Sequence, residues 1–455
     1  MGRVDRADSS RLCREISMRG GWRVGVLPAV WIVAYAVSIV ALAQSEVSGR
    51  VVRGDSAVQS FTLDQAWRRA ELHSATIQAV AANAAAIEGQ SADAQALLWN
   101  NPQLNGEFVH RRVPQPEASV EWQQEWGVGI SQTFETGGQQ QYRRAAASAD
   151  IDAQRLALTE IRRSVRSEVE QRFVGVLSLQ ERLVAEEQAR VLLDDAARLV
   201  GKRVAAGEDT RLDGNLASVE ATRQRNQVAT LREQLLEAQG ELARLLQLPP
   251  NVLPEAIGSL DMRTQNYALD ELLTLASARP QLEALRARER AAESRLDLER
   301  AAVSPDVTVG VGVGREGANN LRENLVGLTI SVPLPFFRHN KTAIGRASTD
   351  LAQVRTERQA TERDIPAQVR LQWQRVESLR ERVRRLESAV IAPLDMNRQL
   401  SSKAFTAGEI GLLQLVLVNR QMLEGQRDLL AARTELRLAS IALESAAGWL
   451  PPDLR

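Results

Sequence analysis

Two kinds of hydrophobic pattern occupy different parts of the chain. In four short stretches apolar residues stand at every second position, which is typical of β-strands. Elsewhere they recur every three or four positions, which predicts long helices that each have one narrow apolar face. The alternating stretches are residues 104–112, 121–134, 306–315 and 326–334. We therefore expect a mainly α protein with a small β part, made of two hairpins at about residues 103–134 and 306–334.

Each predicted strand is apolar on one side and small or polar on the other. The stretches are 9–14 residues long, which is enough for the roughly 9–11 residues of a tilted transmembrane strand, and strands of outer-membrane barrels alternate in this way. The side that we expect to face lipid carries Trp122, Trp126, Val128, Ile130, Val307, Val309, Val311, Leu328 and Ile330. An antiparallel sheet on a soluble core also alternates, so that alternative stays open. Four strands cannot close a barrel, and lipid does not tolerate an open sheet edge, so the membrane interpretation requires several chains.

The helical pattern predicts a similar series of helices in each half of the chain. The first half should have helices at about residues 62–98, 139–200 and 211–246, with a turn at 202–210. The second half should have long helices at about residues 340–401 and 412–447, with a turn at 404–411. Pro366 and Pro393 lie inside the second long helix, so we expect a kink or a local break there.

The two halves are related by an internal repeat of about 200 residues. Six apolar positions between residues 165 and 183 recur 200 residues later, and Ala206-Gly207-Glu208 recurs as Ala407-Gly408-Glu409. This period is far longer than that of solenoids, so it indicates duplication of a whole helix–β-hairpin–long helix–turn–helix unit. The expected organisation is a signal peptide at 1–43, a linker at 44–60, a first repeat at 61–250, a linker at 251–266, a second repeat at 267–449 and a tail at 450–455.

The N-terminal segment has the pattern of a secretory signal peptide. Six arginines precede the apolar run Val24–Leu42, and Ala41-Leu42-Ala43 supplies a small-x-small cleavage site. The long apolar run leaves a retained membrane anchor as the alternative, and Met18 is a second candidate start. Cys13 lies upstream of the apolar run, so it cannot be a lipoprotein cysteine.

Composition narrows the classes of function. The 57 basic and 57 acidic residues cancel, which argues against nucleic-acid binding through a basic surface. One cysteine and three histidines exclude a zinc-finger array and a disulfide scaffold. His73, His110 and His339 are isolated in the sequence, so we expect no metal site. No catalytic constellation or nucleotide-binding loop stands out, so we expect neither an enzyme nor a cofactor.

Aromatic residues are few and are concentrated near the predicted hairpins. The chain has 8 Trp, 3 Tyr and 7 Phe in 455 residues, and long helical assemblies need few rings. Those in or beside the hairpins are Trp99, Phe108, Trp122, Trp126, Phe134, Tyr142, Phe336 and Phe337. This concentration is typical of an aromatic belt at a membrane interface.

The order of these features resembles the outer-membrane factor family, the TolC-like channels of tripartite efflux pumps and type I secretion systems. The resemblance covers about residues 60–450. It depends on the duplicated unit, on the Leu-Asp pair that opens each repeat, on Ile-Ser near each strand end (Ile130 and Ile330), and on the Ala-Gly-Glu turns. The modest length and the lack of a lipid-bearing cysteine are most similar to the CzcC-type heavy-metal efflux branch.

The resemblance implies a homotrimer in the outer membrane of a Gram-negative cell. Three chains would form one 12-stranded β-barrel, continued by a long periplasmic α-barrel that holds most of each chain. The helix turns would meet a periplasmic adaptor (membrane fusion) protein, and an inner-membrane transporter, of the RND type in this branch, would supply the energy. The residues that match the tips are Arg203, Gly207, Glu208, Lys403, Gly408 and Glu409.

Some members of the family have a ring of aspartates after the second tip, but this chain has Leu412-Leu413-Gln414 there. In place of such a ring, Asp213 in the first repeat and Gln414 in the second are weak candidates for a pore constriction. The expected function is a passive export channel, for heavy-metal cations if the branch is right, with drug or protein export left open. The alternative is a periplasmic coiled-coil adaptor or scaffold protein, which the two equivalent halves disfavour.

Overall fold

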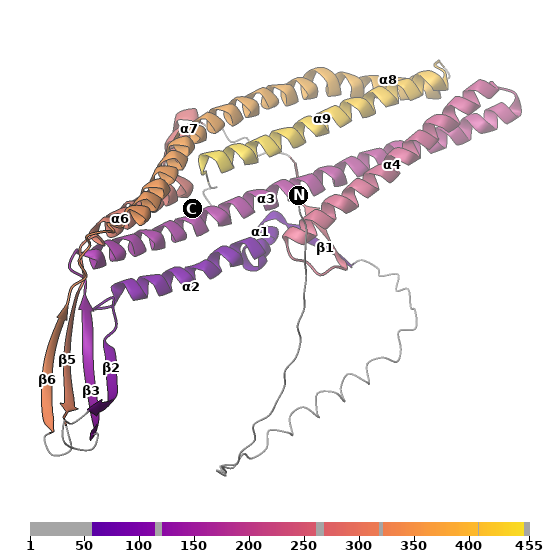
Figure 1. The fold of residues 1–455 in the computed structure, drawn as a ribbon. Coiled ribbons are helices and arrows are strands. Elements are labelled where there is room, and N and C mark those ends of the chain that lie inside the picture. Colours follow the sequence, from indigo (N-terminus) through magenta and orange to yellow (C-terminus); the bar gives the residue numbers. More distant parts are fainter. Residues whose placement is uncertain (1–56, 114–120, 261–267, 318–321, 408, 450–455) are drawn as a thin grey trace, which may run out of the picture. The chain divides into compact units, whose positions relative to one another are not determined.

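The computed structural model describes residues 57–113, 121–260, 268–317, 322–407 and 409–449. The expected signal peptide, the C-terminal tail and Gly408 lie outside these residues. Within the described part, Figure 1 shows long helices lying side by side and four strands grouped at one end of them.

The order of elements is the same in both halves. The first half consists of β1 (Ala57–Thr62), α1 (Leu63–His73), α2 (Ala75–Gln95), β2 (Gln103–Val113), β3 (Glu121–Phe134), α3 (Gln139–Ala206) and α4 (Arg211–Leu245). The second consists of β4 (Val252–Ile257), α5 (Leu269–Ser277), α6 (Pro280–Ala301), β5 (Val307–Glu316), β6 (Glu323–Ser331), α7 (Lys341–Arg385), the π-helical turn η1 (Leu386–Ile391), α8 (Ala392–Thr406) and α9 (Leu412–Ala447). Each half therefore runs strand, two helices, hairpin, long helix and return helix.

The first predicted helix is two helices. Ser74, between α1 and α2, has an extended backbone with ψ 120°, and α2 already ends at Gln95. The prediction of one continuous helix over residues 62–98 was wrong because this alanine-rich segment has no proline to mark the break. The start of α1 follows the ordinary rule, since the side chain of Thr62 accepts a hydrogen bond from the backbone N–H of Gln65.

The repeated apolar positions form the buried seams of the two long helices. Val169 and Val176 of α3 are fully buried, and so are Val369 and Val376 of α7, which lie 200 residues later. The cluster around α3 and the cluster around α7 both include residues of α9. The return helix of the second half therefore packs on the long helices of both halves.

Two segments that we interpreted as linkers contain strands. β1 and β4 pair in parallel, with Phe61 opposite Ala256, and both residues are buried in the cluster that contains Phe173 of α3. The sequence pattern did not predict these strands because each is only six residues long and the pairing joins segments about 195 residues apart. Such non-local pairing leaves no trace in a local pattern.

The two prolines of the second long helix behave differently. α7 continues through Pro366 without a break in the helix, so the break that we considered there is absent. Pro393 lies in the first turn of α8, directly after η1. A π-helical turn inserts an extra residue into the helix, and this is the local break expected near Pro393.

Outside their seams the helices are polar. Arg355 of α7 pairs with Glu289 of α6 at 2.9 Å, and Arg190 and Asp194 pair along α3 at the same distance. Among the residues that the structure describes, no helix combines the length and the apolar character that crossing a bilayer requires.

Candidate membrane sheet and helical tips

The two hairpins form a single antiparallel sheet in the order β2-β3-β5-β6. The pairing of β3 with β5 joins them, and it places Val128 opposite Val313 and Ile130 opposite Val311. The sheet lies at one end of the helices (Figure 1). Each outer strand, β2 and β6, has one edge without a strand partner in the described part of the chain.

The register brings most of the apolar residues of the four strands onto one face, which we call the apolar face. Residues that stand opposite each other in antiparallel strands share a face. Leu104, Ile130, Val311 and Leu328 thus form one row across the sheet. All nine residues that we expected to face lipid lie on this face: Trp122, Trp126, Val128, Ile130, Val307, Val309, Val311, Leu328 and Ile330. Phe108, Val313 and Val326 lie there too, and the same alternation would have identified them.

The apolar face is the more exposed face of β3. Trp126, Val128 and Ile130 are 46%, 45% and 50% exposed, whereas Glu125 on the opposite face is only 6% exposed. Val307 and Val309 are half-buried near the helix end of β5. A sheet of a water-soluble protein buries its apolar side, so this arrangement is the inverse of a soluble core. That the nine residues contact lipid stays a prediction.

The opposite face carries small residues together with polar and acidic ones, and we call it the small-residue face. A Cβ atom on Gly129 would lie 3.1 Å from the carbonyl oxygen of Val311, and one on Gly314 would lie 3.0 Å from that of Trp126. Glycine therefore permits a close approach of β3 and β5 on this side, as it does where sheets curve. Arg111 and Glu125 form an ion pair on this face at 3.0 Å.

Aromatic residues lie at both ends of the apolar rows. Trp122 and Trp126 lie toward the loop end of β3, and Phe134 lies at its helix end, twelve positions from Trp122. At about 3.3 Å per residue this is about 40 Å along the strand, or about 30 Å in height at a tilt of roughly 40°. Near the helix end, the guanidinium of Arg143 lies 3.8 Å from the ring centre of Trp99. The spacing matches the hydrocarbon thickness of a bilayer, about 30 Å.

The two helical tips close with the same backbone hydrogen bond. The N–H of Glu208 donates to the carbonyl oxygen of Arg203 at 2.9 Å, and the N–H of Glu409 donates to that of Ala404 at 2.8 Å. Both tips lie at the end of the helices that is away from the sheet (Figure 1). The repeated Ala-Gly-Glu sequence is therefore a repeated helix C-cap.

The residues that we expected to contact an adaptor lie at these tips. Gly207 has φ 80°, a left-handed conformation that favours glycine, and Gly408 falls outside the described residues. Arg203 forms an ion pair with Asp209 at 3.1 Å, while Lys403 is exposed. Contact with an adaptor stays a prediction.

The two candidates for a pore constriction have different environments. The carboxylate of Asp213 accepts hydrogen bonds from the backbone N–H of Thr210 at 3.2 Å and from its hydroxyl group at 2.6 Å. Asp213 therefore caps the start of α4, a local role that the sequence of a capping box already indicates. Gln414 is exposed in the first turn of α9. A constriction at either residue stays a prediction.

A buried carboxylate that we did not predict joins three helices. Glu186 of α3 is fully buried; it accepts hydrogen bonds from Arg427 of α9 and from Gln224 of α4, each at 2.6 Å. Burial acts to raise the pKa of Glu186, but these hydrogen bonds together with the positive charges of Arg427 and Arg182 outweigh it and hold the pKa below its usual value. The available signal was a glutamate three residues after Leu183, in line with the apolar seam.

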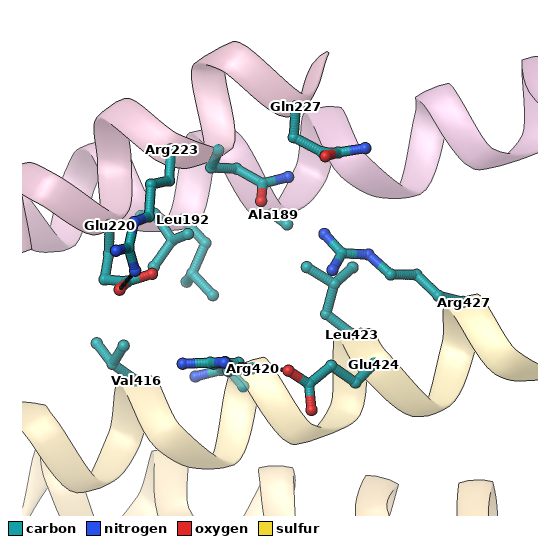
Figure 2. Close-up of a pocket in the computed structure, with 13 residues that line it drawn as sticks. Ala189, Leu192, Glu220, Arg223, Gln227, Val416, Arg420, Leu423, Glu424 and Arg427 are labelled. Carbon is teal, nitrogen blue, oxygen red and sulfur yellow. Dashed lines mark hydrogen bonds and ion pairs between the residues drawn. The ribbon is translucent and has the colours of Figure 1, made fainter. Parts of the chain in front are cut away.

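A cavity of about 240 Å³ lies beside this carboxylate, between α3, α4 and α9 (Figure 2). Its arginines have carboxylate partners: Arg223 pairs with Glu220 and Arg420 with Glu424, each at 3.0 Å. The charges of the walls are therefore largely balanced. The described residues contain no group of three or more His, Cys, Asp or Glu side chains that is suited to a metal ion.

A second buried glutamate of α3 titrates in the opposite direction. Glu170 forms an ion pair with Arg437 of α9, yet burial raises its pKa to about 7, because the desolvation of the carboxylate outweighs the attraction of Arg437. Glu444 adds to the increase, and Arg166 opposes it. The contact between α3 and α9 therefore contains one carboxylate held charged and one that takes up a proton near neutral pH.

Comparison with known proteins yields one family and several distant relatives. The family model described as outer membrane efflux protein matches residues 66–247 and 273–449. The chain is 24% identical over 300 residues to the cobalt-zinc-cadmium resistance protein CzcC of Cupriavidus metallidurans, a match that covers 66% of this chain and 70% of CzcC. It is 28% identical over 351 residues to the pyoverdine export outer membrane protein OpmQ of Pseudomonas aeruginosa, covering 71% of this chain and 70% of OpmQ. The chain spans 63–70% of the length of the curated relatives that it matches.

A solved structure has the same fold. The outer membrane protein VceC of Vibrio cholerae superposes with a TM-score of 0.70 at 16% sequence identity, over 85% of this chain and 96% of VceC. At this identity the likeness concerns the fold alone. Because it covers most of both chains, the overall arrangement of the elements belongs to a known architecture.

Proposed function

The chain belongs to the outer membrane efflux protein family, and we propose that it forms the outer-membrane channel of a tripartite export system. As a member of this family, the chain is a component of an efflux system and not an enzyme. The proposed role is a passive conduit, whose energy comes from an inner-membrane transporter of the RND type. Most of the chain would lie in the periplasm and the sheet in the outer membrane.

The observation that carries this proposal is the exposed apolar face of the sheet. Trp126, Val128 and Ile130 are about half exposed while Glu125 behind them is buried, so the solvent best suited to this sheet is lipid. Its outer strands, β2 and β6, would leave unpaired backbone groups in lipid. Pairing β6 of one copy with β2 of the next removes both edges, and three copies give a closed barrel of 12 strands. A homotrimer is therefore part of the proposal.

The helical hairpins would continue the barrel into the periplasm. The tips lie away from the sheet (Figure 1), where they would meet the hairpins of a periplasmic adaptor. The proposed contact residues are Arg203, Gly207, Glu208, Lys403, Gly408 and Glu409. A narrowing of the pore near Asp213 and Gln414 belongs to the same proposal.

The proposed cargo is a heavy-metal cation. The name of CzcC concerns resistance to cobalt, zinc and cadmium, and this relative supports the metal branch. OpmQ is named for pyoverdine export, so export of a small organic molecule is the second candidate cargo. In either case the channel would pass its substrate without binding it tightly.

Cell fractionation tests the location. The protein should stay with the outer membrane through osmotic shock and require detergent for extraction, and the extracted protein should migrate as a trimer. Release by osmotic shock without detergent would support a periplasmic adaptor or scaffold instead.

Growth tests of a deletion strain on a cobalt, zinc and cadmium series test the cargo. Unchanged tolerance would contradict the metal branch and leave the channel intact.

A further inference from the structure

The loop end of the sheet places charges of opposite sign on its two faces. On the apolar face, Arg112 of β2 stands opposite Trp122, and Arg315 of β5 stands opposite Trp126. The small-residue face carries acids at the same end, namely Glu107, Glu125, Glu316 and Glu323. Neighbouring residues of a strand point to opposite faces, so the sequence Arg111-Arg112 sends one guanidinium to each side.

The two arginines of β2 have different partners. Arg111, on the small-residue face, pairs with the buried Glu125 at 3.0 Å. Arg112 and Arg315 are exposed, and neither has an ion-pair partner among the residues that the structure describes. A guanidinium presents five N–H donors that match carboxylate and phosphate oxygens. Arg112 and Arg315, which we call the arginine rim, therefore offer donors on the apolar face alone.

The arginine rim is the last of three layers on the apolar face. Rows of Val, Ile and Leu come first, Phe108 and Trp126 follow, and the arginines stand beside or beyond these rings toward the loops. His110 stacks on Trp122 with 4.9 Å between ring centroids, which holds that ring at the same level. Tryptophan rings prefer the headgroup level of a bilayer, so side chains next to them reach the phosphate groups.

We propose that the arginine rim binds the anionic phosphate groups of membrane lipids in the leaflet next to the strand loops. The inference rests on the proposed function, because it requires the apolar face to be in lipid. A lipid is the occupant that fits both parts of the surface: its acyl chains cover the apolar rows, and its phosphate accepts hydrogen bonds from Arg112 or Arg315. A free phosphate ion would leave those rows uncovered. The acids on the other face are shielded from this contact by the sheet.

Lipid selectivity in bilayers of defined composition tests the inference. The full-length protein is reconstituted in mixtures of phosphatidylcholine and phosphatidylglycerol in which one lipid at a time is brominated. Bromine quenches the fluorescence of tryptophans it touches, and Trp122 and Trp126 adjoin the rim. For the wild type we expect phosphatidylglycerol to be enriched about fivefold around these rings, and less at high salt. The double variant Arg112→Gln, Arg315→Gln should lower the enrichment to about onefold.

The matched control uses the other face of the same strands. Arg111→Gln combined with Glu125→Gln removes a charge pair one residue from Arg112, and it should keep the wild-type selectivity. If the rim variant keeps the enrichment, or the control loses it equally, the arginine rim is not the binding site. If neither brominated lipid quenches the wild type, the sheet is not in the bilayer and the proposed function fails first. Normal quenching without selectivity overturns the lipid inference alone.

Discussion

The two helical hairpins bury the same repeated positions but are built differently. In the first, α3 runs for 68 residues without interruption before α4 returns along it. In the second, α7 ends at Arg385 and the π-helical turn η1 follows it. The helix then continues as α8, and Pro393 lies near the start of α8. Both hairpins have the same buried seam, so they differ in the continuity of the long helix and in the contacts beside that seam.

The contrast is sharpest near Gln224 and Gly425, which lie 201 residues apart. In the first hairpin Gln224 hydrogen-bonds the buried carboxylate of Glu186. In the second, a Cβ atom on Gly425 would lie 2.8 Å from a methyl group of Leu394 and 3.4 Å from one of Ile391. π-Helical turns frequently mark functional sites in helices. At this level the first hairpin has a polar contact beside an uninterrupted helix, whereas the second has an apolar contact beside a local irregularity.

The largest expected effect comes from cutting the ion pair that ties the second hairpin to the first. Arg427→Met leaves the carboxylate of Glu186, which is fully buried, without its cation. An uncompensated buried charge costs about 3–5 kcal/mol, so we expect the free energy of unfolding to fall by about that amount. Thermal and denaturant unfolding of the purified protein, followed by helical circular dichroism, measure the change.

Two further variants separate the buried pair from a general effect on α9. Arg420 pairs with Glu424 along α9 and is exposed, so Arg420→Met should cost less than about 1 kcal/mol. Adding Glu186→Leu to Arg427→Met removes the stranded carboxylate and should restore most of the stability. Equal losses from the two arginine variants would contradict a tie at Glu186.

The second effect is a pH dependence of the contact between α3 and α9. Burial raises the pKa of Glu170 to about 7, whereas the unfolded chain releases this proton near 4.5. The folded protein therefore binds this proton more tightly than the unfolded chain does. The resulting contribution to the free energy of unfolding is complete below about pH 4.5 and is lost as the pH rises to about 7. We expect a loss of about 1–3 kcal/mol over that window, measured as unfolding at pH 5 and pH 7.5.

Glutamine variants test the assignment to Glu170. Glu170→Gln stays neutral at all pH values, so it should flatten the dependence between pH 5 and pH 7.5. Glu241, whose exposed carboxylate pairs with Arg172, is the matched control, and Glu241→Gln should leave the slope unchanged. The pKa of Glu186 is lowered, so its contribution has the opposite sign and is lost only in acid. A slope that survives Glu170→Gln would place the titration elsewhere.

Much of this architecture is visible in the sequence because local patterns determine it. Alternation located the strands and assigned Trp126 and Ile130 to one face, since a residue's side of a strand depends only on its parity. The three- and four-residue spacing located the long helices, since a residue's side of a helix depends only on its position in the 3.6-residue period. The Ala-Gly-Glu tripeptides located the tips, because a helix C-cap needs a glycine at a fixed place.

Features that depend on distant partners were beyond these patterns. The register between β3 and β5 joins the two hairpins, and the β1–β4 pair joins two supposed linkers. The tie at Glu186 needs Gln224 and Arg427 from two other helices. Nothing in the neighbourhood of Glu186 in the sequence reveals those partners, although a glutamate aligned with an apolar seam is a reason to look for them.

A third, smaller effect concerns the close contact at η1. Gly425→Leu forces a side chain against Leu394 and Ile391, and overpacking of this kind costs about 1–2 kcal/mol. Gly240 of α4 is the matched control in the first hairpin, because a Cβ atom there meets nothing within 4 Å. Gly240→Leu should gain about 0.5–1 kcal/mol from helix propensity. Equal behaviour of the two variants in thermal unfolding would show that the second hairpin is no more tightly packed than the first.

The smallest expected effect lies at the starts of the two return helices. The hydroxyl group of Thr210 accepts a hydrogen bond from the backbone N–H of Asp213 at 3.2 Å and so caps α4, whereas Gly411 gives α9 no side-chain cap. Thr210→Ala should therefore cost about 1 kcal/mol, and Gly411→Ser should gain a few tenths of a kcal/mol. Amide hydrogen exchange measures the stability of each helix start separately. In the wild type the first turn of α9 should exchange faster than that of α4. Thr210→Ala should raise the exchange rate in the first turn of α4, and Gly411→Ser should lower it in the first turn of α9. If the first turn of α9 is already the better protected in the wild type, contacts beyond its own cap stabilise it, and the caps do not account for the difference between the two helix starts.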